Sequence, residues 1–333
     1  MEDLGVADTR AGAWRDRRAL VTGATGIVGS WVVKELLARE ASVVVLVRDA
    51  DPQSELLRSG DIGRTTVVNG ALEDVRTVAR AVDEHEVDTV FHLGAQTLVG
   101  VAHRNPLSTW EANVRGTYNV LEAVRERRDV VRAVVVASSD KAYGESDVLP
   151  YTEQTPLAGR HPYEVSKVCA ELLARSYRHT YGLPVGVARC GNVYGGGDLN
   201  WSRLVPGTIR SILRGERPVL RSDGTFVRDH LYVKDAARSY LCLAAGLDDV
   251  RLHGEAFNFS AEAPIRVDEM VARIGKLMGD GKVEPEILDA AVGEIRDQHL
   301  DAGRARSLLG WSPTYDLDAG LVETIAWYRA FLV

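Results

Sequence analysis

Apolar residues along the chain follow two different periods. Short runs rich in Val, Ile and Leu are typical of strands buried on both faces, and they occupy 18–22, 42–47, 65–68, 89–93, 131–138 and 185–188. Apolar residues at helical spacing lie between these runs, at 28–40, 75–85, 106–128 and 163–181. Strands that alternate with helices predict an α/β fold in which a doubly wound parallel sheet is covered by helices on both faces.

The pattern changes after about residue 192. Three consecutive glycines are followed by a helical stretch at 204–214, then by short strands and polar loops. Residues 229–247 again have the pattern of a strand that leads into a helix. We therefore predict a main domain over 16–191, to which 228–258 returns, and a smaller, mainly substrate-binding α/β portion over 192–333.

A glycine-rich turn joins the first predicted strand to the first predicted helix. Gly23, Gly26 and Gly29 lie three residues apart. Such glycines permit a tight turn, a close approach of the backbone to a pyrophosphate, and close packing of the helix on the strand, while the helix N-terminus attracts phosphate charge. In this strand–turn–helix context the pattern predicts a site for NAD or NADP. A tight turn without a ligand is the alternative.

The end of the second strand bears on which of the two cofactors binds. An acidic residue there would bind the ribose 2′-hydroxyl, whereas an arginine suits a 2′-phosphate. Val47 stands at the expected acidic position and Arg48 follows it, but Asp49 could turn inward. Arg48 favours NADP, although it could also be a solvated loop cation, so the choice between NAD and NADP stays open.

Tyr163 and Lys167 form a Tyr-x-x-x-Lys pattern at the start of a predicted helix. A spacing of four puts both side chains on one helical face. A tyrosine with a pKa of about 10 is a weak base at neutral pH, but an adjacent ammonium favours its phenolate. Tyr163 could then accept a hydroxyl proton while a hydride leaves the same carbon. The two residues are the predicted centre of a redox step.

Composition limits the classes of partner. The net charge of -7 argues against a nucleic-acid-binding surface, and no apolar run is long enough to span a membrane. The polar N-terminal segment lacks a signal region, and the three cysteines have no spacing that suggests a disulfide framework or a metal site. We expect a cytoplasmic protein. Lysine is scarce beside arginine, occurring only at positions 34, 141, 167, 234, 276 and 282.

Together these motifs resemble the extended short-chain dehydrogenase/reductases. Other segments that match the family's pattern are His92–Gln96, Asn113–Thr117, Arg189–Gly195, Val227–Val233 and Asp301–Trp311. The resemblance covers about residues 18–330 and implies a Rossmann domain, a smaller domain that binds a nucleotide sugar, and a tightly bound NAD or NADP that is regenerated in each turnover. It also implies a homodimer formed through two helices of each subunit, near 106–128 and 163–181.

Three consecutive residues indicate which reaction within that family to expect. Ser139 stands where the family places the Ser or Thr that hydrogen-bonds the sugar O4, and Asp140 and Lys141 follow it. At these last two positions 4-epimerases usually carry small or neutral residues, 4,6-dehydratases carry Asp-Glu, and the CDP-glucose type carries Asp-Lys. Residues 95–99, 104–106 and 195–198 also look like the CDP-glucose 4,6-dehydratases.

The Asp-Lys pair suits an elimination. Oxidation at C4 gives a ketone that acidifies the C5 proton; a base must then remove that proton, and an acid must protonate the departing 6-hydroxyl. Asp140 is the candidate acid and Lys141 the candidate base, because lysine, unlike arginine, can be neutral at accessible pH. The alternative is an ion pair, or an Asp and a Lys that face solvent.

The resemblance implies further binding residues. Those for the substrate are Ser139, Asn192, Arg203, Leu204, Arg228 and Arg296, with arginines pairing to the diphosphate. Those for the cofactor are Gly23, Thr25, Gly26, Ile27, Val28, Arg48, Ala71, Leu72, Leu93, Ala95, Thr97, Tyr163 and Lys167. Ala71 replaces an Asp that many relatives carry near the adenine, so backbone groups of Ala71 and Leu72 would serve there. The segment around Arg228 resembles dTDP-glucose dehydratases and epimerases more than the CDP-glucose type.

The sequence therefore predicts an NDP-glucose 4,6-dehydratase, with CDP-glucose favoured as substrate. The alternative is an NDP-sugar 4-epimerase, which would need Tyr163 and Ser139 but not the Asp140–Lys141 pair. A third hypothesis is a non-catalytic, cofactor-sensing regulator on the same scaffold, against which the intact Tyr163 and Lys167 argue.

Overall fold

A seven-stranded parallel sheet forms the centre of the molecule. The computed structural model describes residues 13–279, 281, 283–290 and 294–332. The strands lie in the order β11-β6-β5-β4-β1-β2-β3. Their bounds are β1 (Arg18–Thr22), β2 (Ser42–Val47), β3 (Thr66–Asn69), β4 (Thr89–His92), β5 (Ala133–Ala137), β6 (Val185–Cys190) and β11 (Ala256–Phe259). The central strands are buried on both faces, which explains their continuous apolar runs.

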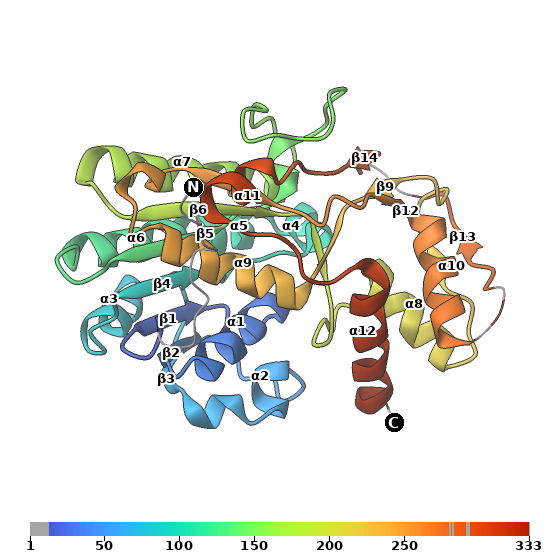
Figure 1. Cartoon of the computed structure of the whole chain (residues 1–333), viewed down its shortest axis with the longest axis horizontal. Helices are drawn as coiled ribbons and strands as arrows, with labels where there is room; N and C mark the ends of the chain where they lie inside the picture. The colour runs from blue at the N-terminus through green and yellow to red at the C-terminus, as the bar shows by residue number, and fades with distance from the viewer. Residues whose placement is uncertain (1–12, 280, 282, 291–293, 333) are drawn as a thin grey trace, which may run out of the picture.

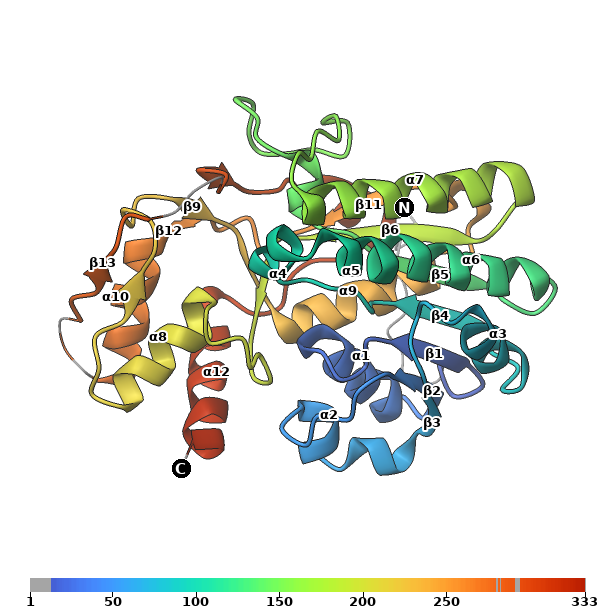
Figure 2. The same ribbon diagram turned by 180° about the vertical axis from the view of Figure 1, so that it is seen from behind.

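Helices cover both faces of this sheet, as Figures 1 and 2 show from opposite sides. On one face lie α1 (Ile27–Ala38), α9 (Val233–Gly246) and α11 (Gly303–Leu309), next to the short α2 (Glu55–Arg58). On the other face lie α3 (Val75–Asp83), α6 (Gly116–Glu126) and α7 (Pro162–Tyr181), with α4 (Val99–Arg104) and α5 (Pro106–Trp110). The predicted doubly wound Rossmann-type fold is confirmed.

The single helix predicted over 106–128 is wrong in its middle. The structure has α5, then one π-helical turn over Glu111–Arg115, then α6, which ends at Glu126. Apolar spacing does not distinguish an α-helical turn from one that is a residue wider, so the sequence pattern could not reveal the interruption. Such π turns occur often at functional sites. Here the turn carries the buried side chain of Asn113.

A second, smaller body follows the main sheet, at the right of Figure 1. Its helices are α8 (Leu204–Leu213), α10 (Val267–Met278) and α12 (Leu317–Leu332), which share one apolar cluster. Its small sheets have the orders β12-β9-β14 and β13-β8. Those strands are β8 (Val219–Leu220), β9 (Val227–Arg228), β12 (Ile265–Arg266), β13 (Glu286–Ile287) and β14 (Asp297–Gln298).

The chain crosses between the two bodies more than once. β7 (Asn192–Tyr194) pairs in parallel with β10 (His230–Tyr232), and the chain then returns through α9 and β11 to the edge of the main sheet. After β14 it crosses again to α11, which packs on β11. None of the helices formed by the described residues combines the length and the apolar character that a membrane crossing would need.

Candidate active site

The glycine turn after β1 is built as a phosphate cradle. Gly23 has φ +70°, and a Cβ on it would lie 2.7 Å from the Cα of Gly94, so the ends of β1 and β4 nearly touch. A Cβ on Gly29 would lie 2.1 Å from the carbonyl oxygen of Gly23. Gly26 is the N-cap residue of α1 and supplies no side-chain cap, and the first helical turn has no acidic residue. Its free N–H groups and the helix dipole therefore fit the pyrophosphate of a dinucleotide.

Thr22 and His92 fix the two loops that flank this cradle. The Thr22 hydroxyl accepts hydrogen bonds from the N–H groups of Leu93 (3.1 Å) and Gly94 (3.0 Å) and lies 2.9 Å from His92 Nδ1. His92 Nε2 lies 3.0 Å from the hydroxyl of Thr117, which itself donates to a carbonyl. His92 is thus a neutral ring protonated on Nε2, in keeping with burial, which lowers its pKa to about 3.

Asn113 joins the loop after β4 to the start of α7. Its Oδ1 accepts from the N–H of Gln96 (2.7 Å), and its Nδ2 donates to the Gln96 carbonyl (3.0 Å) and to the Ser166 hydroxyl (2.8 Å). Ser166 in turn donates to the carbonyl of Tyr163 at 2.7 Å. One buried amide therefore sets the position of the loop after β4 relative to the start of α7.

Tyr163 and Lys167 lie together in the first turns of α7. The helix begins at Pro162, where Glu164 accepts from the N–H of His161 at 3.1 Å. Both side chains are buried, and Lys167 Nζ lies 6.0 Å from the centre of the Tyr163 ring and donates to the Ala137 carbonyl at 2.9 Å. Burial raises the pKa of Tyr163 to about 12 and lowers the pKa of Lys167 to about 8. The pair is held in a dry setting that disfavours both charged forms.

Ser139 and Asp140 follow directly after β5 and face Tyr163. The Ser139 hydroxyl donates to Asp140 Oδ1 at 2.8 Å, and it accepts from the N–H of Lys141 at the start of a single 3-10 turn, Asp140–Tyr143. The Ser139 hydroxyl lowers the pKa of Tyr163 against the effect of burial, while the charge of Asp140 raises it. Asp140 is 1% exposed, and its Oδ2 has no hydrogen-bond partner among the described residues.

The amine of Lys141 points to the C-terminal half of the chain. Its Nζ donates to Oε1 of Gln298, on β14, at 3.1 Å. Within the described part of the chain Lys141 has no ion pair, so the ion pair considered as an alternative for Asp140 and Lys141 is absent there. Gln298 is fully buried, and its Nε2 has no partner among the described residues.

A buried ion pair between Arg189 and Glu171 joins β6, α7 and the turn after β5. Arg189 on β6 donates to both oxygens of Glu171, at 2.9 and 2.5 Å, and to the hydroxyl of Tyr143 at 2.7 Å. Glu171 also accepts from Ser138 at 2.5 Å. Since both charges are almost fully buried, loss of one partner would leave an uncompensated charge.

The three arginines expected to bind the diphosphate differ in their freedom. Arg203 precedes α8 and bonds Asp198 Oδ2 at 3.0 Å, and its charge lowers the pKa of Tyr163, so it lies on the same side of the site. Arg228 is buried and donates to the carbonyls of Val227 (2.9 Å) and Arg296 (2.8 Å). The side chain of Arg296 donates to Thr225 at 3.2 Å. Among the described residues, Arg203 and Arg296 thus bond side chains, whereas Arg228 bonds backbone carbonyls.

The remaining substrate candidates lie near β7 and α8. The N–H of Asn192 donates to the Asp229 carbonyl at 2.9 Å, and Leu204 is the first residue of α8. Asp229 was not among the predicted residues. Its carboxylate accepts from Ser260 and from the N–H of Leu300, and burial raises its pKa to about 6, with a smaller contribution from the charge of Asp140.

The remaining cofactor candidates line the rim of the sheet. Arg48 and Asp49 are mostly exposed and bond each other at 2.6 Å, so Asp49 does not turn inward. The Leu72 carbonyl accepts from Asn119 Nδ2 at 2.8 Å. Ile27 and Val28, the first residues of α1, are half-buried. The others are half-buried or exposed on the loops that follow β1, β3 and β4, namely Thr25, Ala71, Leu93, Ala95 and Thr97.

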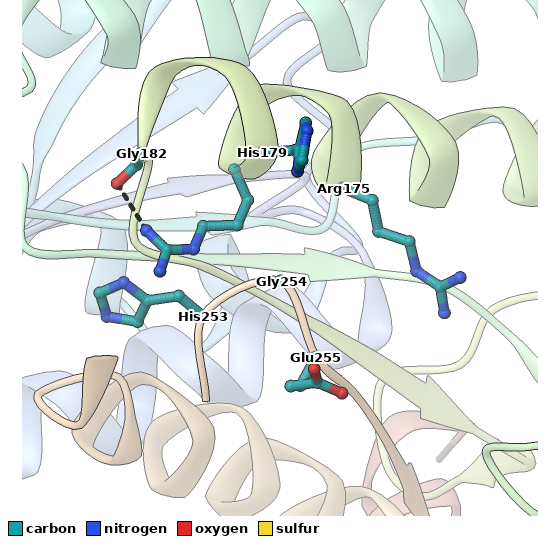
Figure 3. A pocket seen from close by; sticks show the side chains of 7 residues that line it. Arg175, His179, Gly182, His253, Gly254 and Glu255 are labelled. Atoms are coloured by element: carbon teal, nitrogen blue, oxygen red, sulfur yellow. Dashed lines mark hydrogen bonds between the residues drawn. The ribbon is translucent and has the colours of Figure 1, made fainter. Parts of the chain in front are cut away.

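A separate cavity of about 490 Å³ lies where β6 and β11 begin, at the C-terminal end of α7 (Figure 3). It is lined by Arg175, Arg178, His179, Gly182, His253, Gly254 and Glu255. Tyr163 is the second residue of the same helix and precedes Arg175 by 12 residues, which at about 1.5 Å per residue separates them by roughly 18 Å along the helix axis. The cavity is therefore not part of the site that contains Tyr163.

Glu171 and Gln298, which support the site and were not predicted, differ in whether the sequence indicated them. Glu171 stands four residues after Lys167 on one face of α7, so a charged residue on that face was a usable signal. Gln298 had none, because it lies just before the segment 301–311 that matched the family pattern and 157 residues from its partner.

Known proteins are similar to this chain over most of its length. The model of the NAD dependent epimerase/dehydratase family matches residues 19–259. The CDP-glucose 4,6-dehydratase of Salmonella typhimurium is 31% identical over an alignment that covers 96% of this chain and 92% of that protein.

Solved structures with the same fold include a dehydratase and an epimerase. The dTDP-glucose 4,6-dehydratase of Streptomyces venezuelae, with NAD bound, has a TM-score of 0.84 and 29% identity, covering 94% of this chain and 97% of that one. The UDP-glucose 4-epimerase of Thermotoga maritima, with UDP-glucose, has a TM-score of 0.86 and 27% identity, covering 95% and 100%.

Proposed function

We propose a function from the premise that the chain belongs to the NAD dependent epimerase/dehydratase family, whose model matches well over half of it. The chain is then an NDP-glucose 4,6-dehydratase, a lyase that forms an NDP-4-keto-6-deoxy-hexose, with CDP-glucose as the favoured substrate. It divides into a cofactor-binding part, 16–191 with 228–258, and a mainly nucleotide-sugar-binding part, 192–333.

One observation carries the proposal. After β5 the chain carries the buried carboxyl group of Asp140 and, next to it, the amine of Lys141. That amine donates a hydrogen bond to the neutral amide of Gln298 and not to a carboxylate. A 4-epimerase needs neither group, whereas an elimination needs one acid and one base. The sequence identity of 31% to a CDP-glucose 4,6-dehydratase, over 96% of the chain, supports the same assignment.

The redox step belongs to Tyr163, Lys167 and Ser139. When bound, NAD supplies the acceptor for the hydride removed from the sugar C4 and brings a positive ring to the site. Ser139 orients the C4 hydroxyl, and Tyr163 accepts its proton. Burial alone opposes that role, since it raises the pKa of Tyr163 to about 12, so the phenol depends on nearby positive charge to become a base.

The elimination belongs to Asp140 and Lys141. The C4 ketone acidifies the C5 proton, which the Lys141 amine removes. The C6–O bond breaks as Asp140 delivers its proton to the departing hydroxyl, and water leaves. The hydride returned to C6, with a proton at C5, completes the product. The Asp140 carboxyl group is buried, and its Oδ2 has no partner in the described region, so that oxygen is free to contact the departing hydroxyl.

The cofactor in this proposal is NAD, tightly bound and regenerated in each turnover. The uncapped start of α1 and the glycine contacts between β1 and β4 fit its pyrophosphate. Arg48 supports NADP only weakly, because its guanidinium is already paired with Asp49 in solvent. The solved dehydratase from Streptomyces venezuelae holds NAD.

The runner-up function is NDP-sugar 4-epimerization, supported by the structural likeness to UDP-glucose 4-epimerase. A regulator that only senses the cofactor is a remote third. The test is to incubate the purified protein with CDP-, dTDP-, UDP- and GDP-glucose and measure product masses. Loss of water is expected, fastest from CDP-glucose. An unchanged mass with a new epimer would overturn dehydration, and no turnover would favour the regulator.

The protein in this proposal is a cytoplasmic homodimer. Apolar side chains on α5, α6 and α7 are exposed, including Leu107, Tyr118, Leu172 and Tyr181. These helices lie side by side on one face of the sheet (Figure 2), so a second copy could cover them together. Sedimentation equilibrium should give twice the chain mass, and Leu172→Glu should shift it to the monomer.

A further inference from the structure

Gln298 and Lys141 meet although they belong to different halves of the chain. Lys141 is on the turn after β5 of the main sheet, whereas Gln298 is on β14 of the small sheet β12-β9-β14. The Lys141 amine donates to Gln298 Oε1 at 3.1 Å, and Gln298 is fully buried. The contact therefore exists only when the C-terminal part is docked on the main sheet.

The backbone around Gln298 leaves its side chain little freedom. β14 pairs in parallel with β9, with Gln298 opposite Arg228. On the following residues, the N–H of Tyr151 donates to the His299 carbonyl at 2.9 Å, and the N–H of Leu300 donates to Asp229 at 3.2 Å. The backbone of Gln298 is thus fixed by its pairing with β9 and by the hydrogen bonds of the two following residues, independently of Lys141.

A neutral amide is the acceptor that a basic lysine requires. The amide oxygen accepts a hydrogen bond from one N–H of the amine. This bond fixes the orientation of the amine nitrogen and therefore the direction of the lone pair that must meet the C5 proton. A carboxylate at the same place would take the same hydrogen bond but would also stabilise the ammonium, which cannot act as a base. The amide orients the amine without holding a proton on it.

We propose that Gln298 is the positioning residue for the base Lys141, and that docking of the 297–301 segment therefore assembles the elimination half of the site. The inference rests on the proposed dehydratase function. It assigns no chemistry to Gln298 itself, which acts through Lys141 only. Among the described residues, neither Tyr163 nor Lys167 forms a hydrogen bond or ion pair with this segment, so the redox half should work without Gln298.

Two substitutions test the two parts of this role. Gln298→Glu keeps the acceptor and adds charge. The rising limb of the pH profile of water loss should move up by about one pH unit or more, so that the rate near neutral pH falls roughly tenfold. Gln298→Leu keeps the size and removes the acceptor. Water loss should fall about 100-fold while KM and C4 oxidation, followed by the absorbance of reduced cofactor in a single turnover, stay unchanged.

A second readout needs neither substrate nor turnover. The chain has only six lysines, so acylation of Lys141 can be followed by peptide mass across pH, with the exposed Lys276 as internal reference. Gln298→Glu should delay acylation of Lys141 to higher pH and leave Lys276 unchanged. Gln53→Glu, the same change at an exposed position, is the matched control and should alter neither residue.

The outcomes separate the inference from the proposed function. If the wild-type protein removes water but Gln298→Glu leaves both the pH profile and the acylation of Lys141 unchanged, the role of Gln298 is overturned. Equal losses of C4 oxidation and water loss in Gln298→Leu would also overturn it, since they indicate general damage. If wild-type protein removes water from no nucleotide hexose while Lys141 acylation still responds to Gln298→Glu, the dehydratase assignment fails and the contact stands.

Discussion

The redox pair and the elimination pair of the site are built in opposite ways. Tyr163 and Lys167 lie one turn apart on α7, both buried, and Lys167 bonds the end of β5. Asp140 and Lys141 are neighbours on a single 3-10 turn; Asp140 points inward, and Lys141 is half-buried with its partner on β14. The redox pair is complete within the main sheet, whereas the elimination pair needs the C-terminal half of the chain.

This difference suggests how one scaffold serves two reactions. In the proposed mechanism, oxidation at C4 depends on Tyr163 and Lys167, which the main sheet and its helices position. Elimination in that mechanism depends on Asp140 and Lys141 after β5 and on the 297–301 segment that docks on them. Each half should therefore be separable by substitution.

The largest effect is expected for Tyr163→Phe. Removal of the phenol takes away the proton acceptor for the C4 hydroxyl, so C4 oxidation and every later step should fall by roughly 10²–10⁴-fold. Single-turnover absorbance of the reduced cofactor measures it. Tyr181→Phe, at the exposed end of the same helix, is the control. Persistence of C4 oxidation in Tyr163→Phe would break the assignment of the redox half.

Lys141→Ala should separate the two halves. Water loss should fall by roughly 10²–10⁴-fold, because no base remains for the C5 proton, while C4 oxidation continues and reduced cofactor accumulates. Lys141→Arg should behave like Lys141→Ala, since a guanidinium keeps its proton. Product mass and cofactor absorbance are measured together. Undiminished water loss in either variant would remove Lys141 from the mechanism.

Asn113→Ala should damage both halves alike. It removes the acceptor and the donor that join the Gln96 backbone to Ser166 on α7, leaving buried groups unpaired, so the free energy of unfolding should drop by about 2 kcal/mol. C4 oxidation and water loss should decline in parallel, in contrast to Gln298→Leu. Urea unfolding with kinetics of both steps measures this; a selective loss of elimination would contradict the proposed position of Asn113.

The smallest effect is expected for His92, on the pH dependence of the free energy of unfolding. Burial lowers its pKa from 6.5 to about 3, so the unfolded chain binds a proton between these values and the folded chain does not. Stability linked to His92 is present above pH 6.5 and is lost as pH falls toward 3. From about pH 6.5 to pH 5 the wild-type protein should lose about 2 kcal/mol more than His92→Gln.

Urea unfolding at the two pH values measures this difference. His179→Gln, at an exposed position of α7, is the control and should follow the wild-type protein. An equal pH response in wild type and His92→Gln would show that the ring between Thr22 and Thr117 is not held neutral by the fold.

Much of the fold and part of the site were predictable from local pattern. Strand runs such as 42–47 and the alternation with helices predicted the parallel sheet, because burial on both faces forces continuous apolar strands. The glycine turn and the Tyr163–Lys167 spacing are also local, since each lies within one turn or one helix. The π turn over Glu111–Arg115 escaped prediction because its apolar spacing imitates an α-helix.

The sequence by itself determined which reactive groups are present and which of them share an element: the phenol and amine of α7, and the Asp-Lys pair after β5. Only the tertiary structure decided what those groups face. Burial sets the pKa of Tyr163 and Lys167, and chain crossings bring Gln298 to Lys141 across 157 residues. The physical reason is that hydrogen bonds and desolvation depend on distance in space, which sequence spacing specifies only within a single helix, strand or turn.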